Sequence, residues 1–190
     1  THVWLAENAT VALPTGDKVL AKANKLLSFS DTGKIKGVRL AENATVILST
    51  GDKAVVEYIY FNDAGKISIH YVKLAENATV TLPTGDKAVV KSISFNDSGT
   101  INYVWLAENA TVTLPTGEKV LAKANEQLSF SATGKITSVR LAENTMVTLP
   151  TGDKAVAGGC DSIFGDVSFN DAGKITYVIL AENAMVTLST

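Results

Sequence analysis

Apolar and polar residues alternate along most of the chain, in short stretches bounded by clusters of Gly, Pro, Asn and Asp. Residues 79–106 show this most clearly, with Val80 and Leu82 alternating in one stretch and Ile93 and Phe95 in the next. A period of two is typical of a strand that buries one face, whereas a helix face repeats at about 3.6 residues. No amphipathic helical stretch exceeds two turns. The sequence therefore predicts an all-β protein.

The four-residue motif Leu-Ala-Glu-Asn divides the chain into repeats. It begins at Leu5, Leu40, Leu74, Leu106, Leu141 and Leu180, with spacings of 35, 34, 32, 35 and 39 residues. Five full units and the start of a sixth leave no room for a separate catalytic domain. We expect a single repeat domain over residues 1–190, with units beginning near 5, 40, 74, 106, 141 and 180.

Each unit has three extended stretches separated by three turn-like clusters. Because an odd number of strands would invert alternate units of an antiparallel sheet, we predict a parallel β-solenoid of about five coils. If the Glu-Asn cluster is not a corner, the alternative is an antiparallel hairpin meander or a five-bladed propeller. Residues 18–30 (KVLAKANKLLSFS) recur almost unchanged at 119–131. Both segments, in units one and four, carry an insertion that units two and three lack, and we expect a bulge or a short helical turn at this insertion.

Phenylalanine and glycine recur at fixed places in the units. One aromatic ring per unit indicates a core ladder, formed by Phe29, Phe61, Phe95, Phe130 and Phe169. Two glycine sets fall where the chain must reverse with a positive φ: Gly16, Gly51, Gly85, Gly117 and Gly152, and Gly33, Gly65, Gly99, Gly134 and Gly173. Neither set has the spacing of a phosphate-binding loop.

An asparagine ends every Leu-Ala-Glu-Asn motif, at Asn8, Asn43, Asn77, Asn109, Asn144 and Asn183. We expect its amide to hydrogen-bond the equivalent amide in the next unit, or to close a turn by bonding its own backbone. The rival interpretation is a glycan, because four of these residues open the acceptor pattern Asn-x-Thr: Asn8, Asn43, Asn77 and Asn109.

Candidate catalytic and metal-binding residues are few. The repeated glutamates are interpreted as solvated turn residues, because an active site needs one asymmetric acid–base pair: Glu7, Glu42, Glu76, Glu108, Glu143 and Glu182. A single cysteine, Cys160, excludes an intrachain disulfide, and His2 and His70 have no evident partner. Residues 158–166 (GGCDSIFGD) resemble a calcium-binding nonapeptide only faintly, and we interpret them as a loop insertion. No catalytic, cofactor or metal site is predicted.

The composition narrows the range of partners. With 17 basic against 19 acidic residues, and no run of Lys or Arg, the chain lacks the charge pattern of a nucleic-acid-binding protein. No window reaches the roughly 18 apolar residues of a membrane helix, so we expect no membrane insertion. An apolar content of 46% indicates an ordered domain. The chain enters in the middle of a repeat, and we expect a processed product or a fragment of a longer array.

Some residues suit an exposed binding face. Paired threonines favour an ice-binding surface, although other units interrupt the array, and exposed tryptophans favour carbohydrate binding. The candidates are Thr79, Thr81, Thr111, Thr113, Trp4 and Trp105.

Residues 169–178 (FNDAGKITYV), 29–38 (FSDTGKIKGV) and 61–70 (FNDAGKISIH) share an aromatic, Asn/Asp, Gly-Lys, aliphatic signature. This signature resembles that of bacterial MORN-like repeat proteins, some of which follow it with a segment similar to LAENATV. The resemblance extends over all five units, although these units are longer and lack a Tyr-x-Gly opening. It implies a hairpin meander and a non-catalytic surface or interaction protein, with no functional residue to transfer.

From these patterns we expect a non-catalytic structural or interaction protein without a cofactor, extracellular or at a cell surface. The terminal stretches resemble interior strands and carry no protective Pro, Lys cluster or helix, so we expect head-to-tail self-association or binding to another surface protein. The alternative function is carbohydrate or ice binding through a repeated exposed face.

Overall fold

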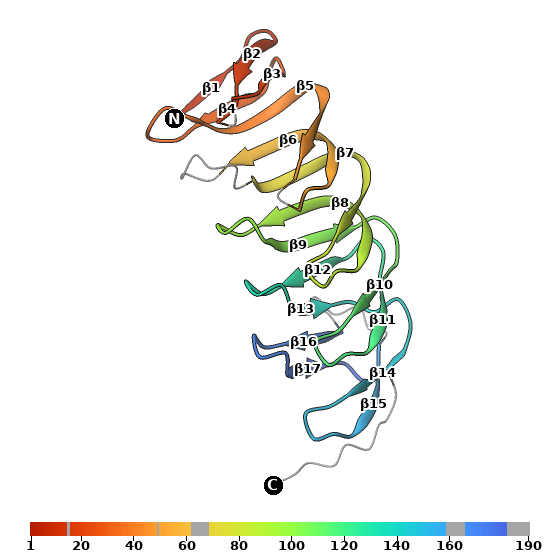
Figure 1. Cartoon of the computed structure of the whole chain (residues 1–190). Helices are drawn as coiled ribbons and strands as arrows, with labels where there is room; N and C mark the ends of the chain where they lie inside the picture. The colour runs from red at the N-terminus through yellow and green to blue at the C-terminus, as the bar shows by residue number, and fades with distance from the viewer. Residues whose placement is uncertain (15, 49, 62–68, 159–165, 182–190) are drawn as a thin grey trace. The chain divides into compact units, whose positions relative to one another are not determined.

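The computed structural model describes residues 1–190 except 15, 49, 62–68, 159–165 and 182–190. All of the regular secondary structure among the described residues is β-strand (Figure 1). The chain divides into two compact units: unit 1 comprises Thr1–Ala78 and Lys91–Ile101, and unit 2 comprises Thr79–Val90 and Asn102–Thr190. The all-β prediction is therefore confirmed.

Unit 1 contains a main sheet and outer hairpins. The main sheet runs in the order β1-β4-β5-β6-β7-β8, and its pairs from β1 to β7 are antiparallel. Its strands are β1 (His2–Trp4), β4 (Leu26–Phe29), β5 (Ile35–Ile47), β6 (Lys53–Phe61), β7 (Ile69–Thr81) and β8 (Lys87–Phe95), of which the end of β7 and the start of β8 belong to unit 2. One outer hairpin joins β2 (Ala9–Ala12) to β3 (Lys18–Ala21), and a second pairs residues 44–47 of β5 with 53–56 of β6.

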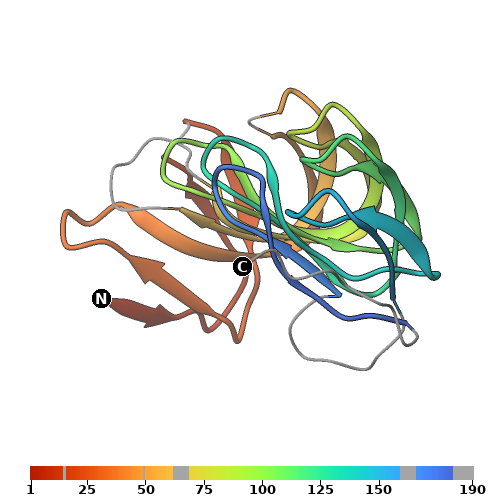
Figure 2. The same ribbon diagram turned by 90° about the horizontal axis from the view of Figure 1, so that it is seen from below.

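Unit 2 repeats this plan. Its main sheet has the order β9-β12-β13-β16-β17, formed by β9 (Ile101–Leu106), β12 (Gln127–Phe130), β13 (Ile136–Val139), β16 (Val167–Phe169) and β17 (Ile175–Val178). Its outer hairpins are formed by the end of β7 with the start of β8, which turn at residues 82–86, by β10 (Ala110–Thr113) with β11 (Lys119–Ala122), and by β14 (Thr145–Thr148) with β15 (Lys154–Ala157). Figure 2 shows the last two of these outer hairpins, in green and blue, set to one side of the main-sheet strands.

One kind of three-residue turn closes both the outer and the main-sheet hairpins. In an outer turn, the Leu114 N–H donates to the Glu118 carbonyl at 2.8 Å and the Gly117 N–H donates to the Leu114 carbonyl at 2.9 Å. A main-sheet turn repeats both bonds at Ser131 and Gly134. This is a type I turn followed by a bulge residue that needs positive φ, and φ is 96° at Gly117 and 81° at Gly134.

The predicted positive φ is confirmed at every described glycine of the two sets: Gly16, Gly51, Gly85, Gly117, Gly152, Gly33, Gly99, Gly134 and Gly173. Gly65 lies outside the described residues.

The Leu-Ala-Glu-Asn motif is the corner where the chain leaves the main sheet and enters an outer hairpin. Strand β5 makes this crossing without a break, and its pairing with β6 shifts register between Arg39 and Ala44. On β6, the register shift between Val56 and Tyr58 leaves Glu57 as an extra residue. A bulge of this kind changes which face of the strand a residue occupies, so Val56 and Ile59 are both buried although they lie three positions apart.

The insertion in units one and four is a tight turn, as the expected interruption of the strand requires. Asn24 and Asn125 adopt φ values of 55° and 60°, a left-handed conformation that asparagine tolerates better than most residues. The N–H of Asn24 donates to the Leu5 carbonyl at 2.8 Å, and that of Asn125 to the Leu106 carbonyl at 3.0 Å. Each insertion is thereby tied to the corner of its own unit.

The core lies between the main sheet and the outer hairpins of each unit. In unit 2 it joins Val112 and Val147 of the outer hairpins with Leu128 and Val139 of the main sheet, all inaccessible to solvent. The predicted core position is confirmed for four of the five phenylalanines: Phe61, Phe95, Phe130 and Phe169. The fifth, Phe29, is only half-buried.

The predicted parallel β-solenoid is wrong. The three-residue turns reverse the chain onto its own neighbour, and every strand pair whose register is defined is antiparallel. The long middle stretch crosses the corner, so each sequence repeat contributes four strand segments, two to each layer. Successive repeats therefore start in the same direction. Within unit 1 and within unit 2, strands of successive repeats belong to one main sheet. Such a sheet differs from the separate blades of a propeller, and it agrees with the alternative of a hairpin meander.

Candidate functional site

Three tyrosines lie close together on the main-sheet surface of unit 1 that faces away from the core. Tyr60 of β6 pairs with Tyr71 of β7 on one side and with Gly37 of β5 on the other. Tyr58 lies two residues earlier on β6, opposite Arg39. All three rings are half-buried. We call Tyr58, Tyr60 and Tyr71, with the flanking Lys36 and Arg39, the tyrosine face.

Gly37 gives the two β6 tyrosines room to lean over β5. A Cβ at this position would lie 3.1 Å from the Tyr58 hydroxyl and 3.1 Å from the Tyr60 ring. An aromatic side chain that covers a glycine on the neighbouring strand shields the exposed backbone there. The absence of a side chain at Gly37 therefore leaves the space that the Tyr58 and Tyr60 rings occupy.

Two cations border the rings. The Lys36 Nζ is 5.8 Å from the centre of the Tyr60 ring, and the Arg39 guanidinium carbon is 5.9 Å from that of Tyr58. At these distances the ring quadrupole attracts the cation weakly and keeps both partners in place. Burial raises the pKa of Tyr58, the nearby Tyr60 raises it further, and Arg39 opposes both. Tyr58 is therefore a neutral hydroxyl, able to donate and accept a hydrogen bond, at neutral pH.

The same surface of unit 2 carries Tyr103 and Trp105, both half-exposed on β9. Their cross-strand neighbours on β12 are Ser129 and Gln127, respectively. The tryptophan candidate Trp105 therefore lies on a main-sheet surface, as does Trp4 of unit 1, which is 71% exposed beside Leu26.

The threonine candidates lie elsewhere, on outer hairpins of unit 2. Thr79 and Thr111 are exposed, whereas Thr81 and Thr113 are half-buried. The Asp86 carboxylate accepts a hydrogen bond from the Thr113 N–H at 2.8 Å and another from its hydroxyl at 3.2 Å. Thr113 therefore helps to hold two consecutive outer hairpins together.

A second contact of this kind occurs one repeat later. Burial tends to raise the pKa of Glu118, but hydrogen bonds from Thr116 and Thr148 lower it more, so that the pKa falls below its ordinary value. We call the acid–threonine contacts Asp86–Thr113 and Glu118–Thr148 stitches. Sequence reasoning missed them, although an acidic residue after the outer-turn glycine and a threonine at the end of the next outer strand were visible signals.

At the corner asparagines whose side-chain hydrogen bonds are seen, the amides do not form the predicted ladder from one repeat to the next. The side-chain oxygens of Asn8 and Asn109 each accept a 2.7 Å hydrogen bond, from the N–H of Ala23 and Ala124, respectively. They fix the inserted turns 15 residues further along the chain, a contact that is neither the predicted amide ladder nor the predicted closure of the asparagine's own turn. The four candidate glycosylation residues are exposed: Asn8, Asn43, Asn77 and Asn109.

Other candidate chemistry is sparse. Within the described ranges, no three His, Cys, Asp or Glu residues gather as a metal site would require. Cys160 and most of the 158–166 loop lie outside these ranges, as do the side-chain surroundings of His70. The same portion of the chain contains no helix long and apolar enough to cross a membrane.

No protein-family model, curated protein or solved structure matches this chain.

Proposed function

We propose that this chain is a non-catalytic repeat protein that binds a protein partner through the tyrosine face of unit 1. The observation that carries the proposal is the cluster of three half-buried tyrosines on adjacent strands, bordered by Lys36 and Arg39. Tyr and Arg are enriched at the energetic centres of protein interfaces, and Tyr offers a large contact area at a small entropic cost because only two side-chain torsions are ordered. The main sheet holds these rings in place in the unbound protein.

The recurrent polar residues support a non-catalytic function. The acids after the outer-turn glycines and the corner asparagines take part in turns and stitches, as Asp86 and Asn109 do. Groups that hold the fold in this manner are not poised for proton transfer, which needs a pair with pKa values pushed apart.

A carbohydrate ligand is the second candidate, because tyrosine rings on a flat sheet can also stack on sugar rings. An ice-binding face would instead use the outer-hairpin threonines, and there the Thr113 hydroxyl is already bonded to Asp86. The tyrosine face therefore supports carbohydrate binding better than ice binding.

We also propose a relationship to MORN-like repeat proteins and a location outside the cell or at its surface. The antiparallel hairpins that turn at residues 96–99 and 131–134, within the resembling signature, support the first of these. The location rests on the resemblance. End-to-end self-association remains a proposal, supported by the exposed edge strand β1 with Val3 and Trp4.

The test is a binding screen followed by a matched variant. Wild-type protein is screened by biolayer interferometry against immobilised extracellular proteins and a panel of polysaccharides, and each hit is measured again with Tyr58→Ser/Tyr60→Ser. We expect at least a tenfold rise in Kd for a protein hit, with Thr111→Ser as the unchanged control. Circular dichroism must show that the double variant is folded. Hits that keep their affinity in the folded double variant would exclude the tyrosine face, and hits confined to polysaccharides would favour the second candidate.

A further inference from the structure

Two segments of the chain, residues 18–30 and 119–131, differ at only two adjacent positions. The second segment has Glu126 and Gln127 where the first has Lys25 and Leu26. Leu26 on β4 pairs with Trp4 on β1, and the two side chains are 38% and 71% exposed, respectively. This part of unit 1 is therefore more basic and more apolar than its counterpart in unit 2.

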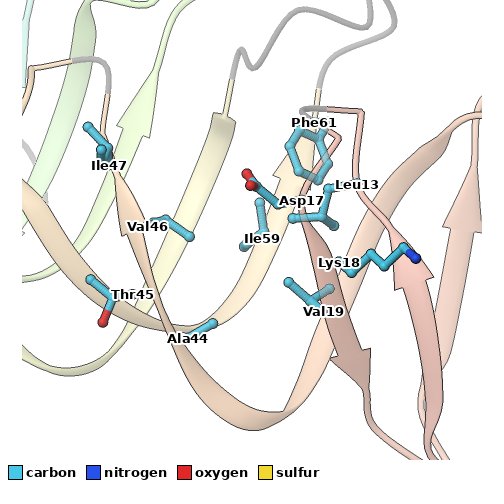
Figure 3. Close-up of a pocket in the computed structure, with 10 residues that line it drawn as sticks. All are labelled: Leu13, Asp17, Lys18, Val19, Ala44, Thr45, Val46, Ile47, Ile59 and Phe61. Carbon is cyan, nitrogen blue, oxygen red and sulfur yellow. The ribbon is translucent and has the colours of Figure 1, made fainter.

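The exposed Leu26 extends the tyrosine face across the main sheet of unit 1. Ile59 of β6 lines a cavity on the core side of this sheet (Figure 3), so its neighbours Tyr58 and Tyr60 lie on the opposite surface. On β4, Ser28 pairs with the glycine that these two rings cover. Leu26 precedes Ser28 by two residues on the same strand and therefore lies on the same surface as the rings.

The glutamate that unit 1 lacks neutralises an arginine in unit 2. There the Nη1 of Arg140 lies 2.9 Å from the Oε1 of Glu126, and the two side chains are only 16% and 28% exposed. Arg39 holds the same place in unit 1, directly before a Leu-Ala-Glu-Asn motif, but the residue 14 positions earlier is Lys25. Arg39 is exposed and lies against the Tyr58 ring, and no carboxylate among the described residues bonds it.

We infer that the partner of the tyrosine face is an acidic protein segment, one carboxylate of which bonds Arg39 as Glu126 bonds Arg140 in unit 2. This inference rests on the proposed function and names the chemistry of its partner. A guanidinium presents paired N–H donors that match a carboxylate, and the neighbouring Lys25 favours an incoming anion further. An apolar side chain of the same segment covers Leu26.

Glu57 of β6 does not cancel the charge of Arg39, because it forms an ion pair with Lys73 of β7.

The first experiment pans a phage library of random twelve-residue peptides against the full chain. We expect the enriched peptides to carry Asp or Glu within two residues of a large apolar side chain. A synthetic peptide of this kind should bind at least tenfold more weakly when its acidic residue is replaced by the corresponding amide, and more weakly as the salt concentration rises. A library without enriched peptides, or peptides that tolerate the amide, would overturn the inference.

A matched variant tests the site on the protein. Lys25→Glu/Leu26→Gln gives unit 1 the sequence of unit 2 at both positions, so we expect it to fold, and its new carboxylate competes for Arg39. The Kd of the peptide should rise at least tenfold, as measured by biolayer interferometry. Lys119→Glu makes the same change of charge at an exposed position of β11 and should leave the Kd unchanged.

Tyr58→Ser/Tyr60→Ser separates this inference from the proposed function. If it abolishes peptide binding while Lys25→Glu/Leu26→Gln has no effect, the tyrosine face binds its partner without an acid at Arg39, and only the inference is overturned. If neither folded variant changes the Kd, the peptides bind elsewhere and both proposals fail. Alginate that binds more tightly than the peptides, and is weakened equally by both variants, would identify an acidic polysaccharide and also overturn the inference.

Discussion

Gly134, in a main-sheet turn, lies directly against Pro83, in an outer turn. A Cβ on Gly134 would be 2.8 Å from the Cβ of Pro83, a separation that real Cβ atoms do not tolerate. Gly173 meets Pro115 at the same distance one repeat later. Within unit 2, the turns of the two layers therefore close over the core, and a glycine is needed for space as well as for its φ.

The matched pair Gly134→Ala and Gly117→Ala separates these two requirements. Both residues have positive φ, which costs a residue with a Cβ about 1–2 kcal/mol. Only Gly134 also meets another residue, and overpacking adds about 1–3 kcal/mol. We expect Gly134→Ala to lower the free energy of unfolding by more than Gly117→Ala, as measured by urea denaturation. Equal losses would show that Pro83 moves aside without cost.

The stitch between Asp86 and Thr113 should be measurable in the same manner. Asp86→Ala leaves the half-buried N–H of Thr113 without its acceptor, and we expect a loss of about 1–3 kcal/mol. Thr111→Val alters an exposed position on the same strand and should stay within about 0.5 kcal/mol of the wild type. If Asp86→Ala behaves like Thr111→Val, water replaces the carboxylate and the stitch contributes nothing to stability.

Acid should weaken the second stitch. Because the folded-state pKa of Glu118 lies below its ordinary value of 4.5, the unfolded chain binds more protons between the two values. The stabilising contribution of Glu118 is therefore complete above about pH 4.5 and is lost as the pH falls through the lower folded-state pKa. Urea denaturation from pH 3 to 6 should show a smaller loss on acidification for Glu118→Gln than for the wild type. Parallel pH profiles for the two proteins would contradict this assignment.

The sequence predicted local structure well and the pairing of strands poorly. Period-two alternation identified the strands, and the described glycines of both sets were correctly placed at positive φ, because these properties depend on nearest neighbours. The solenoid was chosen by counting stretches, and the count failed where a single stretch such as 87–95 crosses the corner and joins both layers.

The candidate site was harder to predict for a related reason. Tyr58 and Tyr60 do not recur at equivalent positions in the other repeats, so a search for repeated residues passed over them. Tyr71 does recur, as Tyr103 and Tyr177, each three residues before the motif leucine, and this signal was visible in the sequence. The tyrosines of β6 meet Tyr71 only through cross-strand register. The stitches were missed because their partners lie 27 or more residues apart and belong to different hairpins.

The phenylalanine ladder gives a graded prediction. Phe95 is almost fully buried, so Phe95→Ala should cost about 3–5 kcal/mol through lost burial and the cavity left behind. Phe29 is half-buried, and Phe29→Ala should cost clearly less because part of its ring already contacts water. Thermal and urea unfolding of both variants will test this order. A small effect at Phe95 would mean that the core collapses around the missing ring.

The corner between the layers also decides where the protein can change in length. The inserted turns of the first and fourth repeats both follow the outer hairpin at this point. Hairpin register on either side is fixed by its own three-residue turn, so added residues at the corner leave both registers intact. A repeat of this design can gain a loop there by duplication or engineering without repacking its core, and new binding loops could evolve at one place in every unit.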